Sequence, residues 1–128
     1  DREAHQETLE ILKSERAEAC GGIIHCFSGD YEMAKACMDM GFHISIPGSI
    51  TFKNAEGFRE TVRRIPLESL LVETDAPFLT PVPFRGKRNE PSYVQYTAQK
   101  VAEIKKVSFE KVAEVTTENA LRVYRMRV

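Results

Sequence analysis

Two residues that can bind a metal ion stand near the ends of two apolar segments. His25 lies near the end of residues 22–27, and Asp75 directly follows residues 70–74. In parallel α/β folds, ligands and catalytic groups gather at the carboxyl ends of strands. A neutral imidazole and a carboxylate suit Zn²⁺, Mn²⁺ or Mg²⁺ to different degrees. His25 and Asp75 are therefore candidate metal ligands. The alternatives are a strand-end hydrogen bond for His25 and a turn-capping role for Asp75.

Other charged residues lie near Asp75 in the sequence. Glu73 stands two residues earlier, which places it on the same face of a strand as Asp75. We expect Glu73 either to support a metal ligand or to form a structural ion pair. Three basic residues follow in a polar, proline-rich loop: Arg85, Lys87 and Arg88. Such a cluster suits phosphate contacts, and Arg85 is the best candidate for substrate binding, although a charged loop can also be merely solvated.

The apolar segments that position these residues alternate with amphipathic ones. Residues 22–27, 42–46 and 70–74 are short and apolar, as is typical of strands buried on both faces. The stretches between them carry apolar residues at helical spacing. Strands that are separated by helices pair in parallel through right-handed crossovers. The predicted fold class is therefore α/β, with three parallel strands and flanking helices.

Four residues predict where helices begin. Asp30, Asn54 and Ser108 are suited to cap the helices that follow them. Pro91 suits the first turn of another helix.

The composition is that of a globular protein. The chain has 128 residues, with 18 Lys and Arg against 19 Asp and Glu, and this balance excludes a polyanion binder that relies on bulk charge. We expect neither a membrane span nor a secretory signal. The three cysteines form no Cys-x-x-Cys pair, which favours reduced thiols and a cytoplasmic location. A catalytic Cys26 would need a lowered pKa.

Several blocks of the sequence, taken together and in order, resemble the TatD family of metal-dependent deoxyribonucleases. They are His25 to Gly29 (HCFSG), Gly41-Phe42 with Ile44-Ser45, Thr51 to Ala55 (TFKNA), Leu71 to Pro77 (LVETDAP), Pro81 to Pro91 (PVPFRGKRNEP) and Thr116 to Ala120 (TTENA).

This resemblance implies a TIM (β/α)8 barrel of the amidohydrolase superfamily with a two-metal site. His25 matches the family ligand that ends the sixth strand, and Asp75 matches the ligand that ends the eighth. Superfamily relatives also use that Asp to accept a proton from water, which makes Asp75 the expected catalytic residue. The implied cofactors are divalent metal ions (Mg, Mn or Zn), two in the complete enzyme. The family's other ligands match no residue of this chain and are expected upstream.

We therefore expect residues 1–128 to form a single incomplete domain, the C-terminal half of a barrel that needs about 250 residues. A half barrel leaves its sheet open at both edges, so we expect a homodimer or a separate N-terminal half to close it. The interior side chains that it would uncover are expected among Ile23, Ile24, Ile44, Ile46, Leu71 and Val72.

The function implied for the full-length parent is hydrolysis of DNA phosphodiester bonds. The same scaffold could hydrolyse esters or amides, for example as an aminoacyl-tRNA deacylase, and nothing in the sequence separates these reactions. A two-metal site binds the attacking water and the leaving oxygen together, and two ligands cannot hold two ions. The isolated chain is therefore expected to be an inactive half barrel.

Overall fold

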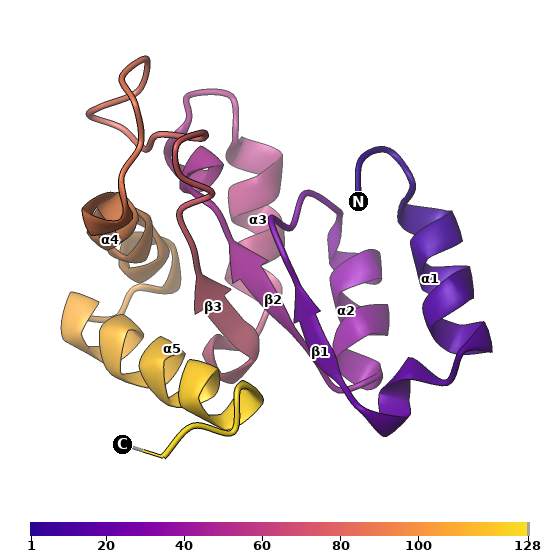
Figure 1. Ribbon diagram of the computed structural model, residues 1–128. Helices are drawn as coiled ribbons and strands as arrows, with labels where there is room; N and C mark the ends of the chain where they lie inside the picture. The colour runs from indigo at the N-terminus through magenta and orange to yellow at the C-terminus, as the bar shows by residue number, and fades with distance from the viewer. Residues whose placement is uncertain (128) are drawn as a thin grey trace.

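The computed structural model describes residues 1–127 and contains one parallel sheet. Its strands are β1 (Gly22–Ile24), β2 (Phe42–Ile46) and β3 (Leu70–Val72), in the order β1-β2-β3 (Figure 1). Ile44 of β2 pairs with Ile24 on one side and with Leu70 on the other. The predicted α/β class with three parallel strands is confirmed.

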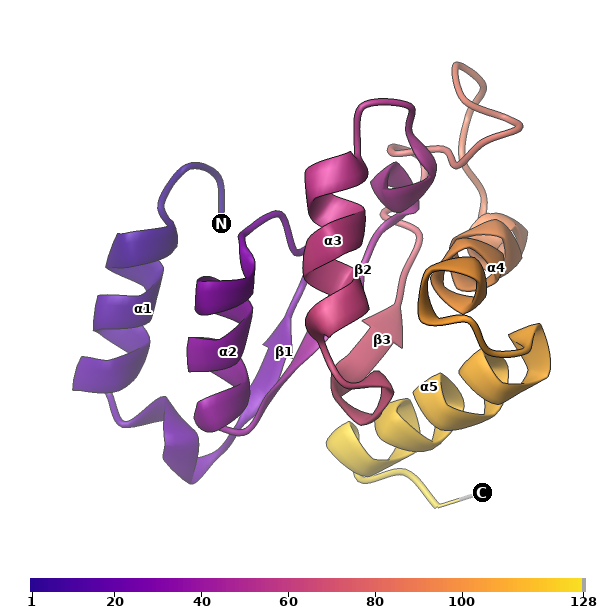
Figure 2. The same ribbon diagram turned by 180° about the vertical axis from the view of Figure 1, so that it is seen from behind.

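Five α-helices pack beside this sheet in residues 1–127. They are α1 (His5–Ser14), α2 (Tyr31–Asp39), α3 (Glu56–Arg64), α4 (Val94–Lys105) and α5 (Phe109–Val123). Seen from behind, α2 and α3 lie in front of the strands, on one face of the sheet, and α1 lies beside α2 (Figure 2). Cover on one face is the arrangement of a barrel wall, whereas a doubly wound sheet has helices on both faces. None of the helices in residues 1–127 combines the length and the apolar character needed to cross a membrane.

Three of the four predicted helix starts are confirmed. The side chain of Asp30 accepts a hydrogen bond from Met33 N, and that of Ser108 accepts one from Lys111 N. Pro91 opens the short 3₁₀ turn Pro91–Tyr93, which leads directly into α4. The prediction for Asn54 is wrong. Ala55 N donates to Phe52 O in a tight turn, so Ala55 takes the cap position of α3 with no side-chain cap.

The outer strands are shorter than the sequence predicts, because the chain turns away from the sheet early. β1 ends at Ile24 and β3 at Val72, although Phe27 N still donates to Ser45 O and Glu73 N to Ile46 O. The residues of β1 are half-buried, so the predicted burial of this strand on both faces is wrong. β1 is an edge strand, and β2 is its only neighbour in residues 1–127.

The two faces of the sheet differ in polarity. On the helix-covered face, Ile44, Ile46 and Leu70 are fully buried, and Ile24 and Val72 pack against this core. Successive residues of a strand point to opposite faces, so the open face presents Ile23, His43, Ser45 and Leu71. Of the six apolar residues among which the interior side chains were expected, Ile23 and Leu71 lie on the open face and the other four face the helices. The open face is mixed in character, not uniformly apolar.

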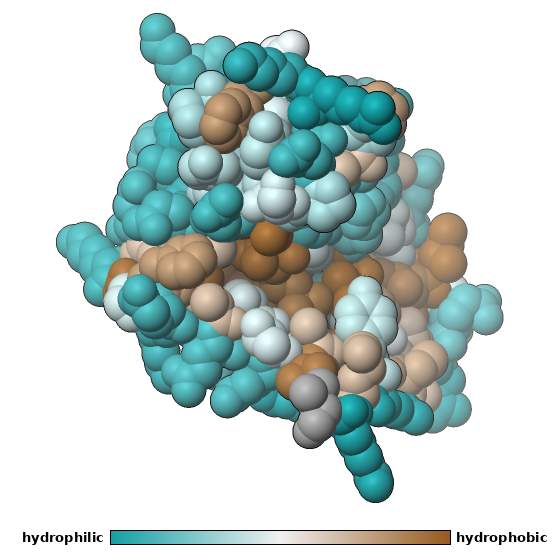
Figure 3. Space-filling model, turned by 60° about the vertical axis from the view of Figure 1, so that its left-hand side comes forward, coloured by the Kyte–Doolittle hydropathy of each residue, from teal (hydrophilic) through white to brown (hydrophobic). Residues whose placement is uncertain are grey.

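Both edge strands keep one unpaired side, since the sheet ends at β1 and at β3. A cleft of about 230 Å³ runs along β3 and α5. Its lining comprises Leu71, Val72, Thr116, Ala120, Leu121 and Met126, together with Thr117. Figure 3 brings the side of α4 and α5 forward and shows hydrophobic residues in a hollowed band between hydrophilic regions.

Candidate metal centre

His25, Glu73 and Asp75 meet at the carboxyl end of the sheet, although their strands are not neighbours. His25 follows β1, whereas Glu73 and Asp75 follow β3, and the small buried Ser45 of β2 lies between them. His25 Nδ1 is 2.9 Å from Glu73 Oε2, and His25 Nε2 is 3.4 Å from Asp75 Oδ1. The structure thus brings together the two ligands that the sequence predicts, and it places Glu73 against the other nitrogen of the His25 ring.

Glu73 holds the imidazole of His25 in its orientation through a hydrogen bond to Nδ1. A carboxylate can only accept hydrogen bonds, so His25 Nδ1 is the donor in its contact with Glu73 Oε2. The same oxygen accepts a hydrogen bond of 2.9 Å from Cys26 N. His25 Nε2, which lies toward Asp75, is therefore the nitrogen that remains for a metal ion. A carboxylate behind the ring is the usual support of a metal-binding histidine, which is the first of the two roles expected for Glu73.

The distances and donor types of this cluster fit a divalent metal ion. Two ligand atoms that each lie about 2.1 Å from a tetrahedral ion are about 3.4 Å apart, which matches the separation of His25 Nε2 and Asp75 Oδ1. One ligand atom from each of His25, Glu73 and Asp75 lies within 4.8 Å of the others. Glu73 Oε1 is buried and has no hydrogen-bond partner among the described residues, so it is available to a further donor or ion.

The backbone is strained on both sides of this cluster. Cys26 and Asp75 both adopt left-handed conformations, with φ of 49° and 56°. Such conformations are uncommon outside glycine and concentrate at functional sites. Burial raises the pKa of the Cys26 thiol, and the nearby Glu73 and Asp75 carboxylates raise it further. The lowered pKa that a catalytic Cys26 would need is therefore absent, and its role here is to turn the chain.

The loop that carries Asp75 rests on the carboxyl end of β2. A Cβ atom at Gly48 would come within 2.3 Å of Leu79 O, so only glycine permits this approach. Thr51 Oγ1 accepts a hydrogen bond from Val82 N. Asn89 is 3% exposed and donates to two carbonyl oxygens of the same loop. Asn89 could not be identified as a functional residue from the sequence, because a buried asparagine in a charged loop carries no local signal beyond the surrounding motif.

The metal cluster opens into a cleft of about 1,090 Å³. Its lining includes Asp1, His5, His25, Cys26, Asp75 and Phe78. The side chain of His25 is 67% exposed to this cleft, whereas that of Glu73 is only 13% exposed. The candidate ligands are therefore accessible to a substrate, while the carboxylate that supports them is shielded.

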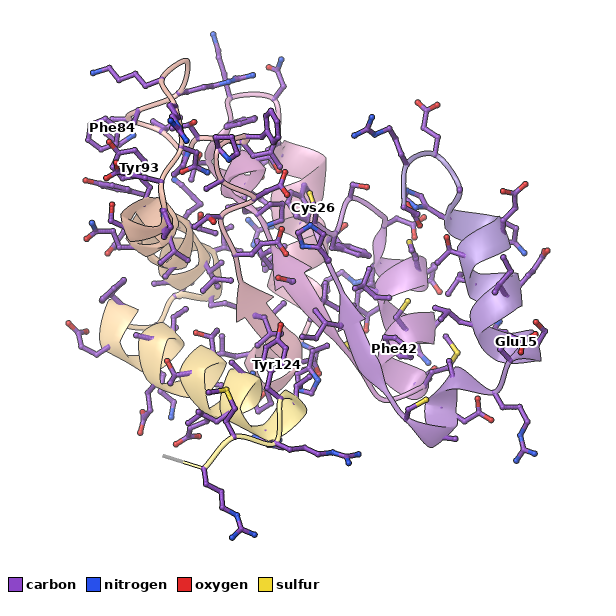
Figure 4. The ribbon with its side chains drawn as sticks, viewed as in Figure 1. Glu15, Cys26, Phe42, Phe84, Tyr93 and Tyr124 are labelled. Carbon is purple, nitrogen blue, oxygen red and sulfur yellow. The ribbon has the colours of Figure 1, made fainter. Side chains whose placement is uncertain are left out.

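Arg85 lies outside the residues that line this cleft. Its guanidinium stacks over the ring of Phe52, with the Cζ atom 3.9 Å from the ring centre. In the same loop Phe84 stacks on Tyr93, with ring centres 4.6 Å apart (Figure 4). Arg88 lines a second cleft, of about 360 Å³, together with Ala76 and Pro77 directly after Asp75. A role for Arg85 in substrate binding stays a prediction.

Comparisons with known sequences show which family the chain belongs to. The family described as TatD related DNase matches residues 1–125. An uncharacterized metal-dependent hydrolase of Bacillus subtilis, YabD, is 56% identical over 126 residues, which cover 98% of this chain and 49% of the relative. YcfH of Escherichia coli K12, described in the same words, is 48% identical over 96% of this chain and 46% of its own length. The chain thus spans about half the length of these relatives.

Solved structures show the same correspondence. The crystal structure of YjjV, a TatD homologue from Escherichia coli K12, superposes with a TM-score of 0.90 at 27% identity and covers 98% of this chain and 48% of YjjV. An uncharacterized amidohydrolase from Saccharomyces cerevisiae shares the fold, with a TM-score of 0.68 at 21% identity over 79% of this chain and 39% of its own. The chain belongs to the TatD family of metal-dependent hydrolases and corresponds to about half of such a protein.

Proposed function

We propose that this chain supplies half of the metal site of a hydrolase that cleaves DNA phosphodiester bonds. One observation carries the proposal: His25 Nε2 and Asp75 Oδ1 lie 3.4 Å apart at the mouth of an open cleft, with Glu73 holding the imidazole from behind. The description of the family as TatD related DNase supports DNA as the substrate.

Each residue of the site has a distinct task in this reaction. A divalent ion supplies a Lewis acid that activates water and neutralises charge on the phosphoryl oxygens. His25 binds through Nε2, because Glu73 occupies its other nitrogen. Asp75 would hold the ion through its carboxylate, which is also suited to accept a proton from the attacking water. Glu73 takes no part in proton transfer and keeps the ring oriented.

The basic loop is suited to hold the phosphate backbone of the substrate. Arg85 is 3.9 Å from the Phe52 ring, a cation–π contact that holds its side chain in place, and its planar donors match phosphate oxygens. Arg88 borders the turn that follows Asp75. We therefore retain Arg85 as the main substrate contact and add Arg88 as a second.

The same centre would also hydrolyse an ester or an amide, including the bond between an amino acid and tRNA, because the scaffold and the metal chemistry are shared. Parallel assays with an oligonucleotide and with an aminoacyl ester separate the two. The proposal requires that cleavage of the phosphodiester is the faster reaction.

A chimera provides the test of activity. In it, this chain replaces the matching half of the Bacillus subtilis relative, to which it is 56% identical. We expect the chimera to cleave oligonucleotides with Mg²⁺, Mn²⁺ or Zn²⁺ and to stop when EDTA is added. The isolated chain should show no turnover above buffer, because His25 and Asp75 alone cannot hold two ions. EDTA-sensitive cleavage by the isolated chain that persists in its Asp75→Ala variant would contradict the site assignment.

We further propose that additional strands pair with the free sides of β1 and β3. A segment equivalent to the other half of the relatives is the favoured occupant, since this chain spans about half their length. A second copy of the chain is the alternative. Sedimentation equilibrium tests this: a compact monomer near 14.5 kDa that melts cooperatively would contradict both arrangements.

A further inference from the structure

Asn89 makes four hydrogen bonds that enclose the turn at Asp75. Its side-chain Nδ2 donates to Thr74 O at 2.7 Å and to Phe78 O at 2.6 Å. Its backbone N donates to Pro77 O at 3.1 Å, and its Oδ1 accepts from Glu90 N at 2.9 Å. Each polar group of the buried side chain thus has a partner. The two carbonyls that bind Nδ2 stand immediately before Asp75 and three residues after it.

The position of Asp75 depends on this turn, not on the sheet. β3 ends at Val72, and the last backbone bond to β2 is made by Glu73 N. Beyond that point Asp75 adopts a left-handed conformation, and its carbonyl accepts a bond from Phe78 N within the turn. The location of the Asp75 carboxylate therefore follows from the shape of residues 74–78, and Asn89 fastens both ends of that segment.

We propose that Asn89 is a positioning residue of the metal centre, which holds the Asp75 carboxylate against His25 without touching metal or substrate. This inference rests on the proposed function, since it assigns the purpose of the turn to metal binding. The residue type fits the task. A primary amide offers two N–H donors and one acceptor, whereas aspartate would set a negative charge against two carbonyl oxygens and serine would supply one donor.

The molecule contains a matched control at the other end of the same strand. Asn119 of α5 is fully buried, and its Nδ2 donates to Leu67 O at 3.1 Å and to Leu70 O at 2.9 Å. Asn119 thus fastens the segment that enters β3, as Asn89 fastens the segment that leaves it. Replacing either amide removes two hydrogen bonds that a buried side chain donates, but only the bonds of Asn89 enclose Asp75.

Nuclear magnetic resonance of the full chain tests the inference without any measurement of activity. Wild type is compared with Asn89→Asp, the milder Asn89→Ser and the control Asn119→Asp. In metal-free protein, we expect the contacts between the His25 ring protons and the Asp75 β-protons to disappear in Asn89→Asp, to weaken in Asn89→Ser and to persist in Asn119→Asp. If these contacts survive unchanged in folded Asn89→Ser, the inference is wrong.

Titration with Mn²⁺ supplies the second measurement, since the ion broadens signals close to it. The Mn²⁺ concentration that broadens the His25 and Asp75 signals should rise about 10-fold or more in the Asn89 variants, as is usual when a group that supports a ligand is lost. It should stay within about twofold of wild type in Asn119→Asp. An equal rise in the Asn119 variant would reduce Asn89 to a stabilising residue and overturn the inference. If wild type shows no broadening at these residues, the proposed metal site itself fails, and the metal-free contacts still decide the role of Asn89.

Discussion

The two ends of β3 use the same device for different purposes. Where the strand begins, Asn119 ties Leu67 and Leu70 to α5, and the Asn119 side chain is fully buried. Where it ends, Asn89 ties Thr74 and Phe78 together, but the enclosed Asp75 is left partly exposed and faces His25. In barrels of this type the amino-terminal face serves stability and the carboxyl face serves catalysis. A buried asparagine therefore has a role that depends on what its turn encloses.

The two ends of β3 also differ in the polar atoms that lack a hydrogen-bond partner. At the carboxyl end, Glu73 Oε1 is buried with no hydrogen-bond partner in residues 1–127, and the exposed His25 Nε2 lies 3.4 Å from the Asp75 oxygen. The unpaired Glu73 Oε1 costs stability, since a buried polar group without a partner loses its hydration. These are also the atoms that a metal ion or a further donor would satisfy. The carboxyl end thus gives up some stability to keep a site available.

The largest effect should come from Asp75→Asn in the chimera. Asparagine tolerates the left-handed backbone that Asp75 adopts, so the turn should remain while the anionic ligand is lost. Removal of a group that supports a metal ligand costs about 10- to 100-fold in activity. Asp75 is itself a proposed ligand, so we expect kcat/KM for oligonucleotide cleavage to fall by more than that. The melting temperature should hardly change. Activity close to that of the unmodified chimera would remove Asp75 from the site.

For Asn119→Ala we expect a loss of stability without a loss of activity. This change removes the two hydrogen bonds that Asn119 Nδ2 donates to Leu67 O and Leu70 O, although Leu67 O still accepts one from Leu70 N, and it should cost about 1–3 kcal/mol of unfolding free energy. Urea unfolding of the chimera measures this loss. Cleavage per folded molecule should stay unchanged, and a selective drop in turnover would break the distinction between the two ends of β3.

Glu73→Gln sharpens the role of the shielded carboxylate. Glutamine keeps the size of the side chain but weakens the charge behind the His25 ring, so metal affinity should fall by about 10- to 100-fold. Calorimetric titration of the chimera with Zn²⁺ measures it. Glu56→Gln is the matched control, because Glu56 is an exposed carboxylate paired with Arg59 on α3. Equal losses in both variants would show that general charge, not support of His25, is responsible.

A smaller effect is expected at His43, on the open face of β2. Burial lowers the pKa of His43, the charge of Arg122 lowers it further, and Nδ1 has no partner among the described residues. The folded state therefore binds fewer protons than the unfolded state does. The contribution of neutral His43 to stability is complete above pH 6.5, the ordinary pKa of histidine, and is lost as the pH falls through the lowered pKa of His43.

Unfolding free energies measured between pH 7.5 and pH 5 test this expectation. The chain should lose more stability on acidification than its His43→Phe variant does. His5→Gln serves as control, since His5 is paired with Asp1. Parallel pH profiles for the chain and the His43→Phe variant would show that His43 is not the group that titrates.

Much of this picture could be predicted from the sequence, since it depends on local pattern. The strand Phe42–Ile46 agrees residue for residue, because a central strand is defined by its apolar run and by the Pro-Gly that ends it. The proximity of His25 and Asp75 follows from the rule that parallel strands end at one edge. The outer strands were predicted too long, because the left-handed turn at Cys26 and the exit of the chain after Val72 leave no local signal.

The remaining features depend on contacts between distant segments. The choice between two roles for Glu73 needed its distance to His25, which is 48 residues away in sequence. Asn89 owes its importance to carbonyls 11 and 15 residues earlier. The Asn54 cap is wrong because a turn at Phe52 moves the cap of α3 to Ala55. Which of the apolar strand residues face the interior is set by the register of the sheet, which places Ile23 and Leu71 there.

Diffraction at the zinc edge from crystals of the chimera soaked in Zn²⁺ tests whether His25 and Asp75 bind one metal ion. We expect an anomalous peak within about 2.0–2.2 Å of both His25 Nε2 and an Asp75 carboxylate oxygen, with Glu73 still bonded to His25 Nδ1. A peak bound through His25 Nδ1 in place of that bond, or at a site that includes neither residue, would contradict it.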